Sequence, residues 1–257
     1  MMRRGLGVVL FCGAIVAAAQ AGGPVAALMD RLETDAVRFN AWLPDGSPSS
    51  EIVAAGHTIA MGGAANNGAR FACFTCHGGN GEGDGAGAVP RLAGLPAYYL
   101  SVQLEAYASG ERLNEIMTPI AQALGPDEMR AVSTYYAALP PLSAAEGIEA
   151  DRDLTQHGAR LSAIGSDEAK ILACANCHGP YGTGMAPSVP PLAGQGRGYM
   201  ERRLAAWRQM DPEQHPSNPM VAIAVKMSDR DIAAAAAYFE ALAPEGAADG
   251  GKARGGD

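Results

Sequence analysis

Hydrophobic and polar positions along the chain predict short helices separated by loops, and no strands. Met129, Val132 and Tyr136 place apolar side chains on one face at helical spacing. Asp127 and, in the second half, Asp229 suit the first turn of a helix, where the helix dipole favours an acidic residue. No stretch shows the alternation of a strand, so the pattern predicts an all-α protein. The predicted helices are residues 51–61, 97–109, 154–164 and 198–209, and two that begin near residues 127 and 229.

Glycine and proline divide these helices into two similar groups. Gly-rich loops occupy residues 78–87 and 179–184, and Pro140-Pro141-Leu142-Ser143 has the composition of a linker. The sequence therefore predicts two small helical domains, residues 51–140 and residues 141–244, the second including the linker.

The two halves repeat one sequence pattern. Pro90-Arg91-Leu92-Ala93-Gly94 corresponds to Pro190-Pro191-Leu192-Ala193-Gly194. A duplicated domain reproduces its flanking residues in this way, so we expect one fold used twice. The helical residues that follow also correspond: Tyr99-Leu100, Gln103-Leu104 and Tyr107 with Tyr199-Met200, Arg203-Leu204 and Trp207.

Met117 and Met220 occupy the same position in this repeat, because the residues that follow them match over the rest of each half. The shared register predicts one structural role for both methionines. The matching residues lie seven and eighteen positions further on: Leu124 and Tyr135-Tyr136 in the first half, Met227 and Tyr238-Phe239 in the second.

Residues 1–21 have the pattern of a secretory signal. Arg3 and Arg4 precede an apolar stretch that ends at a small-x-small cleavage site, Ala19-Gln20-Ala21. This stretch of about 15 residues falls short of the ~20 that a membrane-spanning helix needs. We therefore expect cleavage, periplasmic localisation and no stable membrane span. At the other end, residues 245–257 are rich in Gly, Ala and charge, which is typical of a disordered tail.

The composition of the chain indicates a large buried cofactor, and its net charge excludes some classes of binding partner. The 257-residue chain is 6% aromatic and contains 33 glycines and 17 prolines, so side chains alone would give two small domains thin cores. Its formal charge of −8 becomes −10 when Arg3 and Arg4 leave with the signal. An acidic chain argues against nucleic acid and anionic membrane as partners, since both depend on Lys and Arg clusters.

The cysteines fall into two C-x-x-C-H motifs. Cys12 leaves with the signal, and the other four lie in Cys73-Phe74-Thr75-Cys76-His77 and Cys174-Ala175-Asn176-Cys177-His178. Two disulfides are the usual expectation for four cysteines in an oxidising compartment. Thioredoxin-like sites and zinc knuckles share the C-x-x-C spacing. None of these alternatives explains a histidine directly after both pairs.

Covalent haem attachment explains both the cysteines and the histidines. Two thiols add across the two vinyl groups at one porphyrin edge, and the next residue offers an imidazole to the iron. The motifs therefore predict two covalently bound haem c groups. Cys73, Cys76, Cys174 and Cys177 would attach them, with His77 and His178 as iron ligands.

Both halves resemble the class I cytochromes c, and in particular the two-haem cytochrome c4-like family. The resemblance covers about residues 50–244. The shared pattern is C-x-x-C-H, then P-x-L-A-G-Q, then Y-L-x-x-Q-L, then Met, then an Ala-rich helix with Tyr. It implies two tandem class I cytochrome c domains, with His on one side of each haem and Met on the other. It also implies that the protein carries single electrons in the periplasm.

By this resemblance, the axial pairs are His77 with Met117 and His178 with Met220. Pro90 and Pro190 match the family residue whose carbonyl accepts the other imidazole N–H. The first repeat departs from the family at Leu95, where the second repeat has Gln195. Weaker candidates for contacts to the haem edge or the propionates are Tyr99, Tyr199 and Arg112.

Other methionines and histidines compete with these assignments. Met129 competes for the first iron, and Met210 and Met227 compete for the second, although Met129 and Met227 have the register of core residues. The remaining histidines, His57, His157 and His215, lie in no motif, so we do not expect a bis-His site.

Filled axial positions predict outer-sphere electron transfer rather than an enzyme, because a closed coordination sphere discourages ligand binding. The first hypothesis is an electron carrier. Its donor would be a quinol-oxidising complex or a dehydrogenase, and its acceptor a terminal oxidase or reductase.

The alternative is a dedicated cytochrome subunit of a periplasmic dehydrogenase complex. The N-terminal extension at residues 22–50 motivates this alternative, because it either docks a partner or packs on the first domain. A two-haem peroxidase also carries two motifs but needs an open iron position.

Overall fold

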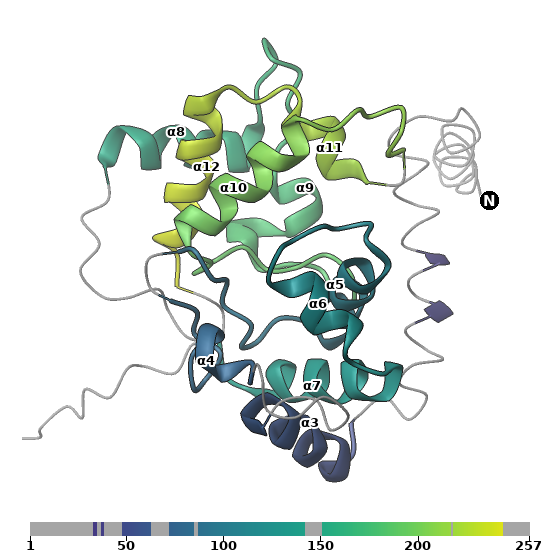
Figure 1. Ribbon diagram of the computed structural model, residues 1–257. Coiled ribbons are helices and arrows are strands. Elements are labelled where there is room, and N and C mark those ends of the chain that lie inside the picture. Colours follow the sequence, from purple (N-terminus) through teal and green to yellow (C-terminus); the bar gives the residue numbers. More distant parts are fainter. Residues whose placement is uncertain are drawn as a thin grey trace, which may run out of the picture.

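The computed structural model describes residues 33–34, 37–38, 48–62, 72–84, 87–141, 151–216 and 218–243. These residues form two helical domains, the first half of the chain below and the second half above in Figure 1. The predicted signal, most of the extension and the predicted tail lie outside the described residues. Within the described ranges, no helix is long and apolar enough to cross a membrane.

Helices make up the regular structure of both domains, which confirms the all-α prediction. Strand pairing in the described ranges is limited to two isolated bridges, Ser166–Ile171 and Met185–Val189. The first domain contains α3 (Ser50–Gly62), α4 (Phe74–His77), α5 (Ala97–Ser109), α6 (Met117–Gln122) and α7 (Pro126–Ala138). The second contains α8 (Arg152–Ile164), α9 (Ala175–His178), the 3-10 turn η1 (Pro180–Gly182), α10 (Arg197–Arg208), α11 (Pro219–Ala224) and α12 (Asp229–Glu240).

The sequence pattern does not predict α6 and α11. Each has six residues, too few for a hydrophobic period to stand out. In both, an asparagine side chain accepts from the methionine N–H: Met117 N–H donates to Asn114 Oδ1 at 2.8 Å, and Met220 N–H donates to Asn218 Oδ1 at 3.2 Å. Asn218 is the N-cap of α11, whereas Asn114 lies two residues before Ile116, the N-cap of α6. Both repeated methionines therefore lie in the first turn of a short helix, with their N–H held by an asparagine.

The first and last helices of each domain cross at a glycine. α3 packs on α7 at Gly56, and α8 packs on α12 at Gly158. A Cβ atom at either position would overlap a backbone carbonyl oxygen of the opposite helix, that of Ala131 or Ala234. The absence of a side chain thus sets the close approach of the helices in both domains.

Large side chains fill the core of the first domain, whereas small ones fill much of the second. In α7, Met129, Val132 and Tyr136 are buried, as their helical spacing predicts. The buried residues of α12 are instead mostly alanines, at 234–237, between Ile232 and Phe239. An alanine-lined helix buries little surface by itself and leaves room for a large buried group.

The glycine-rich loops make the same backbone contacts in both domains. In each loop a glycine carbonyl accepts from the P-x-L-A-G segment, and the last glycine of that segment donates to the final helix. The sequence repeat is therefore also a structural repeat. The equivalent bonds are Leu92 N–H to Gly81 O and Leu192 N–H to Gly182 O, both 2.8 Å, and Gly94 N–H to Tyr136 O at 3.0 Å and Gly194 N–H to Phe239 O at 2.8 Å.

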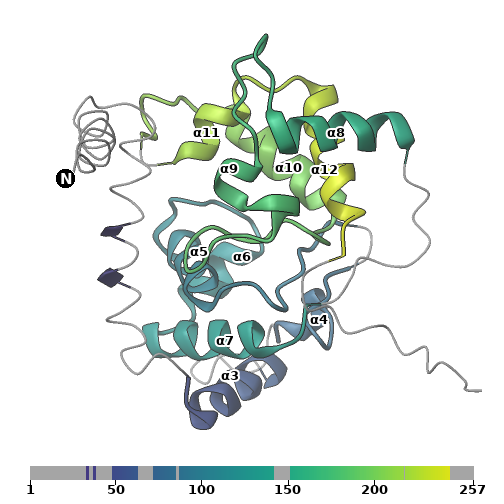
Figure 2. The same ribbon diagram turned by 180° about the vertical axis from the view of Figure 1, so that it is seen from behind.

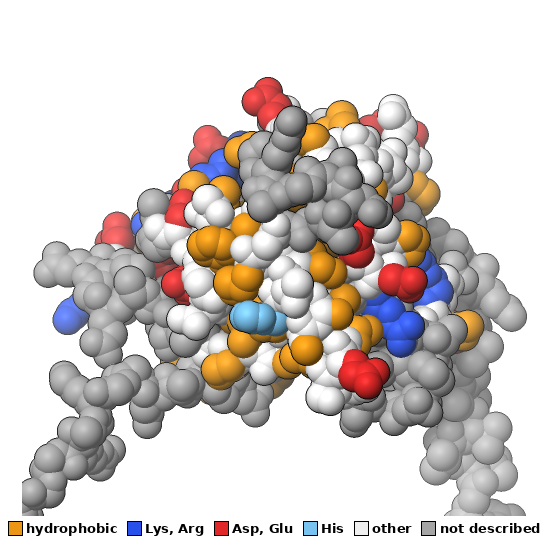
Figure 3. Space-filling view, turned by 60° about the horizontal axis from the view of Figure 1, so that its bottom comes forward, with side chains coloured by type: hydrophobic (Ala, Val, Ile, Leu, Met, Phe, Trp, Pro, Cys, Tyr) orange, Lys and Arg blue, Asp and Glu red, His pale blue; other side chains and the backbone are white. Residues whose placement is uncertain are grey.

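The face of the first domain beneath α3 carries few charges. Along α3 only Glu51 and His57 are ionisable. Figure 3 shows apolar side chains across this face, with acidic and basic ones toward its margin.

The described part of the N-terminal extension contacts the first domain. Arg38 forms an ion pair with Glu105 of α5 at 2.8 Å, and its guanidinium carbon lies 6.0 Å from the ring centre of Tyr98. Both charged side chains are about half exposed, so the pair contributes little stability. The contact places Arg38 against α5 of the first domain; the packing of the rest of residues 22–50 stays a prediction.

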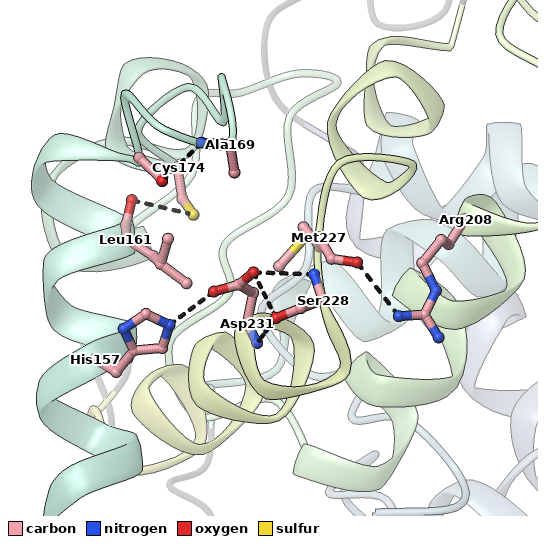
Figure 4. Close-up of polar contacts among 9 residues, drawn as sticks. His157, Leu161, Ala169, Cys174, Arg208, Met227, Ser228 and Asp231 are labelled. Atoms are coloured by element: carbon pink, nitrogen blue, oxygen red, sulfur yellow. Dashed lines mark hydrogen bonds and ion pairs between the residues drawn. The ribbon is translucent and has the colours of Figure 1, made fainter.

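A polar network joins α8 to the start of α12 in the second domain (Figure 4). His157 Nε2 lies 2.7 Å from Asp231 Oδ1, while Asp231 Oδ2 accepts from Ser228 N–H at 2.9 Å and from Ser228 Oγ at 2.7 Å. Burial opposes ionisation of Asp231, but the hydrogen bonds from Ser228 and His157 outweigh it and hold the pKa of this carboxyl below its usual range.

Replacing Gly56 with Ala should lower the free energy of unfolding by about 1–3 kcal/mol, because the new Cβ forces α3 away from α7. Thermal unfolding of the haem-loaded protein measures the effect. Gly62→Ala in the same helix is the matched control. A Cβ there meets nothing within 4 Å, so this variant should be neutral or stabilised by up to about 1 kcal/mol. Equal effects of the two substitutions would contradict the crossing.

Asp231→Asn should destabilise the protein by about 1–2 kcal/mol at neutral pH, because it weakens both the helix cap and the link to His157. A lowered folded-state pKa gives stability that is present above the unfolded-state pKa of Asp and is lost as the pH falls through the folded value. The difference between wild type and variant should therefore shrink below about pH 4. Urea titrations across this range test it, and a difference independent of pH would be inconsistent with the assignment.

Candidate haem sites

Each C-x-x-C-H motif forms a single helical turn. The N–H of His77 donates to Cys73 O, and the N–H of His178 donates to Cys174 O, both at 2.9 Å. A helical turn brings residues three apart to the same side, so the two cysteines of each motif lie together, with the histidine directly after them. The four cysteines are free, so the structure does not support the two-disulfide alternative.

Burial makes these thiols less acidic. It raises the pKa of the Cys174 thiol to about 11, and it also raises the pKa values of Cys73 and Cys177. Thioredoxin-like pairs depend on the opposite, a lowered thiol pKa. The environment of these cysteines therefore argues against a dithiol redox site.

The two motif histidines are held in one orientation. His77 and His178 are buried, with 7% and 8% of their surface exposed. Their Nδ1 atoms lie 3.0 Å from Pro90 O and 2.8 Å from Pro190 O. A carbonyl oxygen only accepts, so Nδ1 carries the proton and Nε2 carries the lone pair that a metal requires. Burial lowers the pKa of both imidazoles, which also favours the neutral form.

The structure separates the candidate methionine ligands from the core methionines. Met117 and Met220 are half-buried at the starts of α6 and α11. Met129 and Met227 are buried within hydrophobic clusters, as their register predicts, so packing occupies these two side chains. Met210 is half-buried just after α10 and has no equivalent in the first repeat.

A cluster of arginine and aromatic side chains lies between the domains. Figures 1 and 2, from opposite sides, both place α5 and α10 toward the domain boundary. Arg112 donates to Tyr199 OH at 3.0 Å and lies 4.4 Å above the ring of Tyr107. Arg203 stacks 4.3 Å above the ring of Trp207. Burial lowers the pKa of Arg203, and the charge of Arg112 lowers it further, so the two cations are close.

This cluster lacks a negative partner. In the part of the chain that the structure describes, no carboxylate pairs with the guanidinium of Arg112 or of Arg203. Buried cations require a counter-charge. Each haem carries two propionate carboxylates, so the residues present fit such a group at the domain boundary.

Sequence reasoning found only part of this cluster. Tyr99, Tyr199 and Arg112 were expected near the haem carboxylates, and all three belong to it. Tyr107 and Arg203 were not expected. The sequence offers one signal for Arg203, which occupies the repeat position of Gln103. Only the packing shows that this arginine is half-buried beside Trp207.

The other histidines have separate roles. His57 packs edge-on against Tyr135, with ring centres 5.3 Å apart, and His157 contacts Asp231. Among the described residues, no group of three or more His, Cys, Asp or Glu side chains could hold a metal ion.

The family model described as cytochrome c matches residues 54–139 and 162–243 of this chain. The chain therefore belongs to the cytochrome c family. It is similar to the thiosulfate dehydrogenase electron acceptor of Stutzerimonas stutzeri, with 43% identity over 181 residues, covering 67% of this chain and 80% of the relative.

Solved structures agree with this assignment. Cytochrome c4 of Acidithiobacillus ferrooxidans superposes with a TM-score of 0.58 and 31% identity, covering 66% of this chain and 98% of that one. Thiosulfate dehydrogenase (TsdBA) of Marichromatium purpuratum gives a TM-score of 0.65 and 36% identity, covering 74% of this chain but only 40% of that longer one.

The protein is a two-haem class I cytochrome of the cytochrome c4 type, with two tandem domains and two covalently bound haem c groups. Its relatives are electron-transfer proteins rather than enzymes, so it is an electron carrier and works with redox protein partners. The peroxidase alternative is thereby disfavoured.

Proposed function

We propose that Cys73 and Cys76 attach one haem, whose iron His77 and Met117 bind. Cys174 and Cys177 attach the second haem in the same way, with His178 and Met220 as its ligands. The support for this assignment is that each set occupies the same structural positions in its domain. These are a one-turn motif helix, a prolyl carbonyl on Nδ1, and a methionine in the first turn of a short helix whose N–H donates to an asparagine side chain.

The haem iron supplies one-electron chemistry, and the chain's residues set its conditions. The carbonyls of Pro90 and Pro190 orient the two imidazoles and increase their basicity. A thioether as second ligand raises the reduction potential and closes the coordination sphere, so electrons pass without bond-making. Arg112 and Arg203 offset the negative charge of the propionates at the domain boundary.

We place this carrier in the periplasm, with a thiosulfate dehydrogenase or a similar dehydrogenase as its electron donor. The signal pattern at residues 1–21 supports the location. The likeness to a thiosulfate dehydrogenase electron acceptor and to the TsdBA structure supports the donor. A terminal oxidase or reductase then takes the electrons. A quinol-oxidising complex is the other donor class, in keeping with the likeness to cytochrome c4.

Exposed apolar side chains near the proposed ligands suit brief contact with such partners. Leu113 and Ile116, 79% and 61% exposed, precede Met117 in the first domain. Tyr181 and Met185, 70% and 45% exposed, follow His178 in the second. Small apolar contacts of this kind are typical of weak electron-transfer encounters.

Met117→Leu should leave the first haem without its sixth ligand, because leucine keeps the volume but has no sulfur. We expect the near-infrared charge-transfer band of Met-ligated ferric haem to lose half its intensity, and a high-spin signal to appear. Met220→Leu should have the same effect on the other haem, and the double variant should lose the band. The control is Met129→Leu, which lies in the core and should keep the wild-type spectrum. A full-intensity band in either single variant would mean that the ligand is assigned wrongly.

Mixing the oxidised cytochrome with thiosulfate and the thiosulfate dehydrogenase of Stutzerimonas stutzeri tests the donor. Stopped-flow absorption should show both haems reduced, at a rate that depends on enzyme and thiosulfate together. Reduction no faster than without the enzyme would exclude this donor. Gel filtration of the mixture separates the two modes of action: a carrier elutes alone, whereas a dedicated subunit elutes as a stoichiometric complex with the dehydrogenase.

A further inference from the structure

One peptide group, that between Pro90 and Arg91, connects the ligand of the first haem to the second domain. Its oxygen, Pro90 O, accepts the hydrogen bond from His77 Nδ1 at 3.0 Å. Its nitrogen, the N–H of Arg91, donates to Gln195 Oε1 at 2.9 Å. A continuous hydrogen-bonded chain therefore runs from the imidazole through the peptide to a side chain of the other domain.

Several hydrogen bonds hold the buried side chain of Gln195 in this position. It is 4% exposed, and its Nε2 donates to Arg91 O at 3.1 Å while its Oε1 also accepts from the N–H of Gly196 at 3.1 Å. The amide thus holds both backbone groups of Arg91. A buried side chain with this many satisfied bonds has one orientation.

The second haem has no equivalent connection. The matching peptide joins Pro190 to Pro191, and Pro191 has no N–H to donate. The residue that matches Gln195 is Leu95, which is buried in the core of the first domain and has no amide. The departure of the first repeat at Leu95 therefore removes the reciprocal contact.

The side chain of Arg91 hydrogen-bonds to equivalent positions in both domains. Its guanidinium donates to Ala93 O at 2.5 Å and to Ala193 O at 2.9 Å, which are equivalent carbonyls in the two repeats. Burial lowers its pKa to about 10, so it stays charged at neutral pH. This cation lies between two equivalent segments, and its charge favours the reduced state of both haems.

We propose that Gln195 is a positioning residue through which the second domain lowers the reduction potential of the first haem. The second haem is not affected in this way. The inference rests on the proposed role of His77 as the iron ligand of the first haem. When Gln195 accepts the Arg91 N–H, it polarises the peptide and makes Pro90 O a stronger acceptor. The imidazole then becomes a better donor to iron, which favours the ferric state and lowers the reduction potential.

Gln195→Leu tests this proposal with the residue that the first repeat already accommodates at this position. The substitution changes no charge and leaves other interdomain bonds in place, from Arg202 to Gly87 O and from Arg112 to Tyr199. Redox titration of the full-length protein, with each haem followed by NMR of its ferric haem methyl groups, should show an upward shift for the first haem. The second haem should keep its wild-type potential.

Gln195→Glu should shift the reduction potential of the first haem in the opposite direction. A carboxylate is a stronger acceptor for the Arg91 N–H, so the potential of the first haem should fall, and by more than that of the second. The new charge by itself would also lower both potentials, so the uncharged Gln195→Leu variant separates the hydrogen-bond effect from the charge effect. The matched control is Arg91→Met, which keeps the backbone N–H but removes the cation and should lower both potentials.

Equal shifts of the two haems in Gln195→Leu, or the same sign of shift for Leu and Glu, would overturn the proposal. These outcomes are distinct from a failure of the ligand assignment, which would appear in the wild-type protein as a spectrum without His/Met coordination. Small-angle scattering of both variants confirms that the domains remain docked. If the Leu variant separates its domains, Gln195→Met, which is also uncharged and is closer to glutamine in length, takes its place, with the same expected shift of the first haem alone.

Discussion

The hydrogen bond between each motif histidine and a prolyl carbonyl is the constraint on which each domain is organised. It fixes the imidazole, and it also requires the chain to return from the one-turn helix to Pro90 or Pro190 within a short loop. Glycines with positive φ, such as Gly83 and Gly184, allow that return. The same segment then bonds to the last helix, so the ligand, the loop and the helix crossing form one connected unit.

Duplication of this unit produces two sites that are alike inside and different at the boundary. Within each domain, the crossing glycine, the loop contacts and the short methionine-bearing helix repeat closely. At the domain boundary, Arg91 faces Ala193, and Gln195 faces Arg91. The boundary is therefore where two copies of one haem domain can acquire different properties.

Charge is distributed in opposite ways at the surface and at this boundary. The chain is acidic overall, yet the buried Arg91 and the half-buried Arg112 and Arg203 lie between or beside the domains without a carboxylate from the described residues. Such an arrangement is costly unless another anion is present. The propionates of two haems supply that charge, and their binding would contribute to holding the domains together.

The sequence by itself determined the all-α class, the duplication, the two haems and the equivalence of Met117 with Met220, because covalent attachment and repetition leave marks at fixed spacings. It missed α6 and α11, because six residues are too few to show a hydrophobic period. It also left open the structural roles of Leu95 and Gln195, because either residue would fit a single small helical domain. Only the tertiary structure decided that, because the partner of Gln195 is a backbone group 104 positions away, which no local pattern encodes.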